Sequence, residues 1–239
     1  MKIAILSDIH ANLTALNEVM KSIALTDGLI LLGDLIDYGP HSNEIIKLII
    51  QCKIPILCNI LGNHEHAIIN ENCSRFSSQR GKLSAQFTRK SLNSISWEYI
   101  TTEMYGKGFL EFNIDGYKCL AVHGSLDDVY WKSIKVSDNL EKYKPYDYVF
   151  SGHSHIPHFF EEFYEVDDVK HRNKKKTVFI NPGSVGQPRN HNPMAQYAIW
   201  NTVTGEITMA KIPYNITKEQ QAFSPEIDIF YKERLESGI

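Results

Sequence analysis

Apolar runs and amphipathic segments alternate along the first quarter of the chain. Residues 3–6, 28–32 and 55–60 are short apolar runs rich in β-branched side chains, which are typical of strands buried on both faces. Between them, residues 12–20 and 42–50 place apolar side chains at helical spacing and predict two helices. This alternation of strands and helices predicts βαβ units and therefore a parallel sheet.

Alternating apolar and polar positions replace the helical spacing after residue 108. Residues 110–114 and 117–122 flank Asp115-Gly116, a dipeptide that favours a tight β-hairpin turn. The basic run 171–176 is typical of a solvated hairpin tip, and residues 227–235 are predicted to be helical. The same reasoning predicts further strands at residues 148–150, 159–166, 177–180, 196–200 and 206–212.

The segment 67–103 interrupts the regular alternation. Its residues 75–80 are polar and indicate a loop, whereas 84–92 and 96–100 are predicted to form helices. We expect a helical excursion that lies over the rim of the sheet, with a plain spacer as the alternative. Because no repeat or low-complexity linker marks a boundary, residues 1–239 are predicted to form a single domain.

Composition is that of an ordinary soluble globular protein, since 43% of the 239 residues are hydrophobic and 22% are charged. A net charge of −3 and a pI near 6.4 make nucleic acid an improbable main partner. The four cysteines form no CxxC pair. The first apolar run is too short for a secretory signal, and none approaches membrane-spanning length. We therefore expect a cytoplasmic protein with reduced thiols and no membrane partner.

Two histidines with one residue between them follow the predicted strand at 148–150. The preceding Gly152 allows the backbone to turn so that the imidazoles of His153 and His155 converge on one point. Neutral imidazoles are good ligands for zinc, iron, nickel and copper. An isolated pair of this kind is more typical of a surface loop, so its interpretation depends on whether the chain supplies further ligands.

Further polar clusters follow the other predicted strands. Ligands of parallel sheets bind outside the carboxyl ends of the strands, so these clusters are predicted to meet at one rim. Carboxylates and neutral imidazoles gathered there would be stabilised together by divalent cations. The clustered residues, in chain order, are Asp8, His10, Asp34, Asp37, Asn63, His64, His123, His153 and His155.

The number of these candidates fits two metal ions better than one. Their mixed nitrogen and oxygen donors favour manganese, iron, nickel or zinc over calcium or magnesium. Two ions about 3.5–4 Å apart need a bridging ligand, which a carboxylate can provide, and such centres serve phosphate ester hydrolysis. The residues alone therefore point to phosphate ester chemistry.

The ordered motifs resemble the calcineurin-like metallophosphoesterase superfamily, and in particular its small prokaryotic single-domain phosphodiesterase and phosphatase branch. The resemblance implies a four-layer α/β/β/α sandwich, with two facing mixed β-sheets flanked by helices. The motifs that carry it are Asp8-Ile9-His10, Gly33-Asp34-Leu35-Ile36-Asp37, Gly62-Asn63-His64-Glu65, Val122-His123-Gly124 and Gly152-His153-Ser154-His155, with Tyr38-Gly39-Pro40, residues 181–189 and Glu233-Arg234-Leu235 in support.

The resemblance also implies a role for each residue. His64 would lie beside the metals and donate to a phosphate oxygen or protonate the leaving group, as a neutral-range imidazole can. Asn63 and His64 would thus serve catalysis and substrate binding. In the implied metal centre Asp8, His10 and His155 hold the first ion, Asp34 bridges, and Asn63, His123 and His153 hold the second ion.

Several of these residues have an alternative interpretation. Asp8 and Asp34 each precede a predicted helix and would be N-caps if they stood alone. Asp37 stands where many relatives carry glycine, and Glu65 where aspartate is commoner, which leaves both roles open. Arg189 has the planar donor fork of a phosphate clamp but could equally anchor its own loop. Three remaining histidines, His66, His158 and His191, are expected to be structural or superficial.

The implied activity is hydrolysis of phosphomonoesters or phosphodiesters by a metal-bridging hydroxide that attacks phosphorus in line. Two divalent transition metal ions would be the cofactors, with manganese the leading candidate. The alternative is a metal-binding scaffold of low turnover that recruits a partner. A nucleotide is one candidate substrate, and residues 67–103 are where its selectivity would reside. The sequence indicates neither the physiological substrate nor the oligomeric state.

Overall fold

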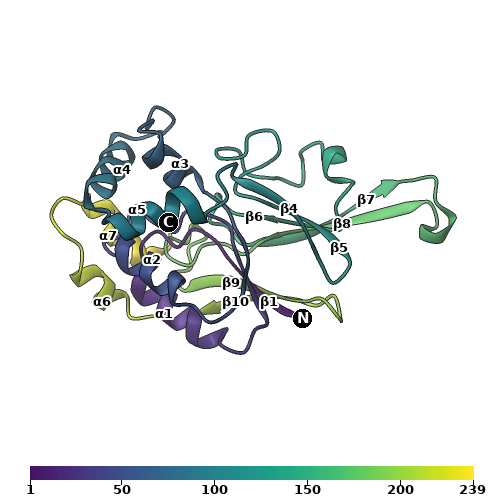
Figure 1. The fold of residues 1–239 in the computed structure, drawn as a ribbon, viewed down its shortest axis with the longest axis horizontal. Coiled ribbons are helices and arrows are strands. Elements are labelled where there is room, and N and C mark those ends of the chain that lie inside the picture. Colours follow the sequence, from purple (N-terminus) through teal and green to yellow (C-terminus); the bar gives the residue numbers. More distant parts are fainter.

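The computed structural model describes residues 1–239, apart from the side chain of His171. Two five-stranded mixed β-sheets form its centre, with strand orders β10-β9-β1-β2-β3 and β4-β5-β6-β8-β7. We call them the first and the second sheet. Helices gather at one end of the molecule, and the long β7–β8 hairpin projects from the other end (Figure 1).

The first sheet is built from the predicted βαβ units. Strands β1 (Lys2–Leu6), β2 (Gly28–Leu31) and β3 (Ile56–Asn59) are parallel neighbours. Strand β9 (Ala195–Asn201) pairs antiparallel with β1, and β10 (Ile207–Ile212) pairs antiparallel with β9. The carboxyl ends of the three parallel strands therefore lie along one rim.

The second sheet repeats this arrangement. Strands β5 (Tyr117–Val122), β6 (Tyr148–Ser151) and β8 (Lys174–Asn181) are parallel. Strands β4 (Phe109–Ile114) and β7 (His158–Glu165) pair antiparallel at its two edges. The second sheet thus has its own rim of parallel carboxyl ends.

Alternation along the strands decides which side chains fill each layer. In β1, Ile3 and Ile5 join the core between the two sheets together with Trp200, whereas Ala4 and Leu6 pack against the helices. All five side chains are fully buried, which explains why β1 is apolar at consecutive positions. Three apolar layers therefore hold the sandwich together, one between the sheets and one on each outer face.

Helices α1 (Leu13–Ser22) and α2 (Ser42–Ile50) lie near the predicted positions, and α2 has the predicted bounds. The outer face of the second sheet is covered by a segment that contains the short 3₁₀ helix η2 (Glu141–Tyr143). The expected sandwich of two mixed sheets flanked by helices is confirmed. The C-terminal helix α7 (Ile229–Ser237) follows α6 (Ile216–Gln221), a short polar helix that the pattern of apolar residues did not predict.

The segment 67–103 is helical, but its first long helix begins earlier than predicted. After α3 (Asn63–Ile69), helix α4 spans Gln79–Ser91, so the loop predicted over 75–80 is wrong at its end. The side chain of Ser78 accepts a hydrogen bond from the Gly81 amide and caps α4, a start signal that outweighs the polarity of this segment. Two consecutive elements complete it, α5 (Ser94–Glu98) and the π-helical turn η1 (Tyr99–Glu103).

The basic run predicted as a hairpin tip is only partly in the turn. Lys174, Lys175 and Lys176 belong to β8, and Lys176 Nζ lies 2.8 Å from Glu161 Oε1 on β7. This cross-strand pairing accounts for basic residues in a strand that projects into solvent. Among the described residues, no helix combines the length and apolarity that crossing a bilayer requires.

Candidate metal centre

Strand ends from both sheets meet at one place. Asp8 and His10 follow β1, Asp34 follows β2, and His155 follows β6. One donor atom from each of these four side chains lies within 4.8 Å of the others, and all four residues are buried. These residues, which we call the first group, are separated by up to 147 positions in sequence, so only the packing of the two sheets brings them together.

The donor atoms of the first group lie close enough together for their lone pairs to converge on one point. His155 Nε2 lies 3.2 Å from His10 Nε2 and 3.2 Å from Asp8 Oδ1. The other ring nitrogen of His155, Nδ1, lies 2.6 Å from the carbonyl oxygen of Gln187 and must donate its proton there. The Nε2 lone pair is therefore directed into the group, an orientation typical of metal-bound histidine.

Asn63, His123 and His153 form a second group beside the first. Asn63 Oδ1 lies 2.9 Å from His123 Nε2 and 3.0 Å from His153 Nδ1. His123 donates from Nδ1 to the carbonyl oxygen of Leu32 at 2.7 Å, so its Nε2 also faces inward. Asp34 Oδ2 connects the groups, because it lies 3.3 Å from His123 Nε2 and 3.7 Å from His10 Nε2.

Two carboxylate oxygens in this region are buried without a hydrogen-bond partner among the described residues, Asp8 Oδ1 and Asp34 Oδ2. A buried polar atom of this kind is costly unless something compensates its charge. The remaining oxygens are occupied, since Ser7 Oγ donates to Asp8 Oδ2 at 2.6 Å and the His64 amide donates to Asp34 Oδ1 at 2.9 Å. The donor set therefore fits divalent cations, which would compensate the two free oxygens.

Burial and neighbouring charges shift the pKa values in this region. Burial raises the pKa of Asp8 to about 7. Burial also acts to raise the pKa of Asp34, but the imidazoles of His123 and His64 hold it well below its usual range. Metal binding requires neutral imidazoles and ionised carboxylates. Burial favours the neutral imidazole because it lowers the pKa of His10, of His153 (to about 3) and of His155.

The backbone at these positions is unusual. The φ angles of Asp8, His10, Asp34, His153 and His155 lie between 46° and 63°, in the left-handed region that non-glycine residues rarely adopt. Such conformations cost about 1–3 kcal/mol each and are concentrated at functional sites. Five of the seven predicted metal ligands share this feature.

Close contact between two loops sets the position of Asp34. A Cβ atom added to Gly62 would lie 2.0 Å from Asp34 Oδ1, and one added to Gly33 would lie 2.3 Å from the Gly62 nitrogen. The glycines in the Gly33-Asp34 and Gly62-Asn63 motifs are therefore needed for this approach of the β2 and β3 loops.

Glu65 holds the same two loops together. Its carboxylate accepts hydrogen bonds from four backbone amides, those of Asp34, Leu35, Ile36 and Gly62, at 2.7–3.2 Å. Burial and the charge of Asp34 act to raise the pKa of this carboxyl, and the amides oppose them. Glu65, whose role the sequence left open, therefore organises the loop that carries Asp34.

His64 pairs with Asp37. Its Nδ1 lies 2.6 Å from Asp37 Oδ2, and both side chains are buried. The other carboxylate oxygen, Asp37 Oδ1, accepts hydrogen bonds from Ser84 Oγ at 2.5 Å and Thr88 Oγ1 at 2.8 Å. Asp37 is thus neither solvent-exposed nor free, and two hydroxyls from α4 reach a residue that precedes them by about fifty positions.

Neither predicted carboxylate serves as the N-cap of the helix that follows it. The side chain of Asn12 caps α1 by accepting from the Ala15 amide at 3.0 Å, and His41 precedes α2 without a side-chain cap. Asp34 does accept from the His64 amide, but this amide belongs to α3. Asp8 and Asp34 are therefore not the N-caps of α1 and α2.

Arg189 lies next to the first group. Its backbone amide donates to the carbonyl oxygen of His155 at 3.3 Å, and its charge contributes to the low pKa of that histidine after burial. Its Nε atom is buried without a hydrogen-bond partner among the described residues. The side chain is therefore not used to anchor its own loop through Nε.

Aromatic rings and hydroxyls surround His64 and Asp37, and the sequence predicted no role for them. The Tyr38 ring lies 4.3 Å from the His64 ring and 4.7 Å from that of His10, and Tyr231 of α7 stacks on it at 4.2 Å. Ser84, Thr88 and Tyr231 belong to no motif. Only the spacing of Ser84 and Thr88, four residues apart and so on one helical face, could have suggested a shared partner.

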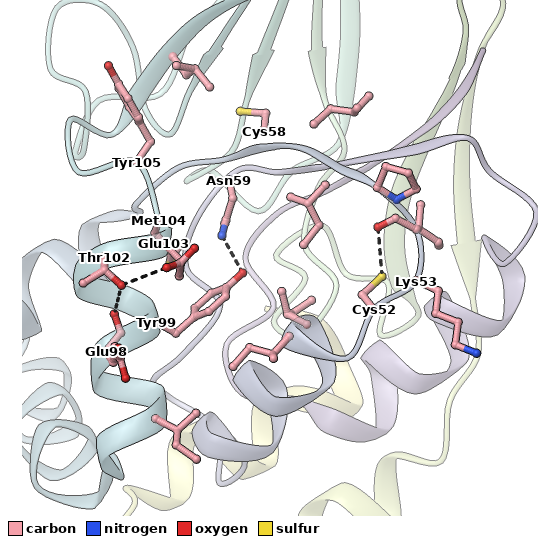
Figure 2. A pocket seen from close by; sticks show the side chains of 18 residues that line it. Cys52, Lys53, Cys58, Asn59, Glu98, Tyr99, Thr102, Glu103, Met104 and Tyr105 are labelled. Atoms are coloured by element: carbon pink, nitrogen blue, oxygen red, sulfur yellow. Dashed lines mark hydrogen bonds between the residues drawn. The ribbon is translucent and has the colours of Figure 1, made fainter.

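A separate cavity of about 780 Å³ lies between α2, β3 and the π-helical turn. Asn59 donates to the Tyr99 hydroxyl at 2.8 Å on one of its walls (Figure 2). Its lining, as far as the structure describes it, includes none of the predicted site residues. The cavity and the clustered donor residues at the strand ends are therefore separate features of the structure.

Residues 1–205 match the model of the calcineurin-like phosphoesterase superfamily domain. The chain belongs to this superfamily. It is 30% identical over 226 residues to the uncharacterized protein MJ0912 of Methanocaldococcus jannaschii, a match that covers 90% of this chain and 89% of that protein. The family is metal-dependent and acts on phosphate esters, which agrees with the buried Asp and His cluster of this chain.

Solved structures agree with the family. The metallophosphoesterase from Sphaerobacter thermophilus superposes on this structure with a TM-score of 0.76 at 25% identity, covering 100% of this chain and 99% of that chain. The hypothetical protein PH1004 from Pyrococcus horikoshii OT3 has a TM-score of 0.79 at 16% identity, with coverage of 100% and 98%. The second likeness supports the fold alone.

Three histidines that were left outside the predicted site take no part in either group. His66 stacks on Tyr130 at 4.1 Å, and His158 Nδ1 lies 3.1 Å from the carbonyl oxygen of Ile156. The backbone amide of His191 donates to the carbonyl oxygen of Gly238 at 2.8 Å. Their contacts are those of structural residues.

Proposed function

We propose that this protein is a binuclear metal-dependent hydrolase of phosphomonoesters or phosphodiesters. The observation that carries the proposal is the position of Asp34 Oδ2, which has no hydrogen-bond partner among the described residues and lies between His10 Nε2 and His123 Nε2. A single carboxylate oxygen between two donor groups is the arrangement that two adjacent ions require.

Each group would hold one ion, as the resemblance implied. Asp8, His10 and His155 would bind the first, with Asn63, His123 and His153 for the second and Asp34 common to both. When bound, such ions act as Lewis acids towards phosphoryl oxygens and lower the pKa of water. Nitrogen and oxygen donors without sulfur favour manganese, with iron, nickel or zinc as alternatives.

His64 would protonate the leaving alcohol. Because the carboxylate of Asp37 can only accept, the His64 Nδ1 atom must donate to it, which leaves Nε2 as the ring atom available to a substrate. Burial acts to lower the pKa of His64, but Asp34 and Asp37 raise it above its usual value, which favours a protonated ring near neutral pH. Arg189 would bind a phosphate oxygen, since its guanidinium lies beside the first group with a free donor.

Hydrolysis of p-nitrophenyl phosphate and bis-p-nitrophenyl phosphate with added Mn²⁺ tests the proposal. We expect cleavage of at least one of them, loss of cleavage in Asp34→Asn and His153→Ala, and normal cleavage in the control His158→Ala, which removes an imidazole outside both groups. Activity that survives in Asp34→Asn would refute the proposed site. Binding of two equivalents of metal without any turnover would favour a metal-binding scaffold instead.

The net charge of the chain bears on the class of substrate. We propose small phosphate esters, including nucleotides, over long nucleic acid, because the net charge is −3. A panel of nucleoside monophosphates, cyclic nucleotides and dinucleoside polyphosphates would rank them by kcat/KM. Cleavage of polymeric DNA or RNA at a higher kcat/KM than any small ester would contradict this part of the proposal.

A further inference from the structure

Asp37 is enclosed by four hydrogen bonds from three parts of the chain. Its Oδ2 atom accepts from His64 Nδ1 at 2.6 Å, and its Oδ1 atom accepts from its neighbour's amide, that of Tyr38, at 2.8 Å. The other two donors are hydroxyls of α4, Ser84 Oγ at 2.5 Å and Thr88 Oγ1 at 2.8 Å. All the side chains in this network are buried, so water does not substitute for any of these donors.

The hydroxyl donors stand out because of where they are in the helix. Serine and threonine inside a helix ordinarily donate to a backbone carbonyl one turn earlier or to solvent. Ser84 and Thr88 instead donate to a carboxylate on the β2 loop, and their spacing of four residues puts both on one face of α4. These two hydrogen bonds therefore link α4 to the β2 loop.

The three hydrogen bonds to Asp37 Oδ1 determine the direction of Asp37 Oδ2. With Oδ1 held by two hydroxyls and an amide, the carboxylate cannot rotate about its terminal torsion without breaking three hydrogen bonds. Oδ2 then remains directed at His64 Nδ1, and the opposite ring nitrogen, Nε2, keeps a fixed direction. The rings of Tyr38 and Phe76, at 4.3 Å and 4.9 Å, limit any tilt of the imidazole.

We propose that Ser84 and Thr88 are positioning residues for catalysis, which act through Asp37 to fix the orientation of the His64 imidazole. The segment 67–103 is then part of the catalytic apparatus and not a spacer. This inference rests on the proposed function, in which His64 protonates the leaving group. If it holds, loss of either hydroxyl lowers kcat most for esters whose leaving group must be protonated, and least for esters whose leaving group is a weak base.

The test compares Ser84→Ala and Thr88→Val, which remove one hydroxyl each, with Thr88→Ser, which keeps it. Ser91→Ala is the matched control, because in the part of the chain that the structure describes Ser91 Oγ donates to the Thr88 carbonyl on the same helix and not to Asp37. Activity would be measured on aryl and alkyl phosphates that span a wide range of leaving-group pKa, with metal content and thermal unfolding recorded for each variant.

We expect each hydroxyl loss to lower kcat on alkyl phosphates roughly tenfold, a part of the 10²–10⁴-fold that general acid catalysis contributes. On p-nitrophenyl phosphate, whose leaving group needs little protonation, the loss should be under about twofold, with KM unchanged. Thr88→Ser and Ser91→Ala should behave as wild type. An equal loss on all esters, or failure of Thr88→Ser to restore activity, would indicate a merely structural role and overturn the proposal.

A second measurement keeps the inference separate from the proposed function. The proton on His64 Nδ1, hydrogen-bonded to Asp37, should give a far-downfield NMR signal, assigned by its loss in His64→Gln. In the protein loaded with Zn²⁺, which is diamagnetic and so does not broaden nearby proton signals as Mn²⁺ would, this signal should shift or broaden in Thr88→Val and Ser84→Ala, and not in Ser91→Ala. If the wild type cleaves no ester, the proposed function fails while the signal still reports positioning. A signal unchanged by loss of both hydroxyls would refute the positioning role.

Discussion

The two rims of the sandwich supply different chemistry. Loops after the strands of the first sheet carry Asp8, Asp34 and Asn63, which contribute oxygen donors, whereas loops of the second sheet carry only imidazoles and a guanidinium among the candidate residues. Among the candidate ligands, the second rim carries no oxygen donor, and the first rim carries a single imidazole, that of His10. The centre therefore depends on the packing of one sheet against the other. The second sheet contributes His123, His153, His155 and Arg189.

The supports of the two rims differ as well. The loop that carries Asp34 is held within the first sheet, by the carboxylate of Glu65 and by the hydrogen bond from the His64 amide to Asp34 Oδ1. Imidazoles of the second sheet depend in part on the first, because His123 donates to the Leu32 carbonyl and the His153 amide donates to Asp8 Oδ2. Hydrogen bonds between the two rims therefore hold both sets of donors in place.

The largest expected effect comes from removing the residue that both groups share. Asp34→Asn should lower kcat/KM for p-nitrophenyl phosphate by about 10³-fold, because a loss of several kcal/mol of charge stabilisation corresponds to such a factor. Metal content, measured by atomic emission, should fall in the same variant. The control Asp27→Asn changes an exposed aspartate of the first sheet that accepts from the Lys2 amide. Retention of two metals in Asp34→Asn would contradict the shared role.

Removal of metal tests whether cations connect the rims. At a free Mn²⁺ concentration of 100 times Kd, binding should add about 2.7 kcal/mol to the free energy of unfolding. Chelation with EDTA should remove this increment, and returning Mn²⁺ should restore it, as urea unfolding would show. His153→Ala should lose part of the increment and His158→Ala none. An identical unfolding curve with and without Mn²⁺ would refute a cation between the two rims.

Glu65→Gln probes the support within the first rim. The new amide would oppose two buried backbone N–H groups that now donate to Glu65 Oε2, those of Asp34 and Gly62. Each unpaired buried donor costs about 1–3 kcal/mol, so we expect the free energy of unfolding to fall by about 2 kcal/mol. The exposed Glu71→Gln, which loses only an ion pair with Arg89, is the control. A fall as small as that of the control would show that the amides are satisfied otherwise.

The smallest expected effect on stability comes from a surface ion pair between the segment 67–103 and the loop after β5. Arg75 of the segment 67–103 lies 2.6 Å from Asp128, which is in the loop after β5. Burial acts to raise the pKa of Asp128, but Arg75 and two backbone amides lower it, so its contribution to stability is present at neutral pH and lost as the pH falls through the lowered pKa. Arg75→Ala should cost about 0.2–1 kcal/mol at pH 7 and less at pH 3. A cost that grows on acidification would contradict this sign.

Much of the fold followed from local patterns. Apolar runs and helical spacing place β1, β2, β3 and α2 near their observed bounds, because these elements bury continuous or amphipathic surfaces that the sequence records directly. The start of α4 could not be read in this way. It depends on a single serine cap within a polar stretch, where no apolar period marks the helix.

The candidate donors also followed from the sequence, but their partners did not. Asp37 and Glu65 each had an open role, and the structure pairs them with α4 hydroxyls and with backbone amides respectively. Hydrogen-bond partners of buried groups are set by contacts between segments about thirty to fifty residues apart. A linear pattern carries little information about such contacts.

The sequence by itself determined the family, the order of the strands along the chain and the identity of the residues at their carboxyl ends. Only the tertiary structure decided that Asp34 lies between the two donor groups, that Asp37 accepts a hydrogen bond from His64, and that α4 supplies hydroxyl donors to Asp37. The physical reason is that residue types and periods are local properties. The direction of a lone pair or a hydroxyl depends on how two sheets and a distant helix pack.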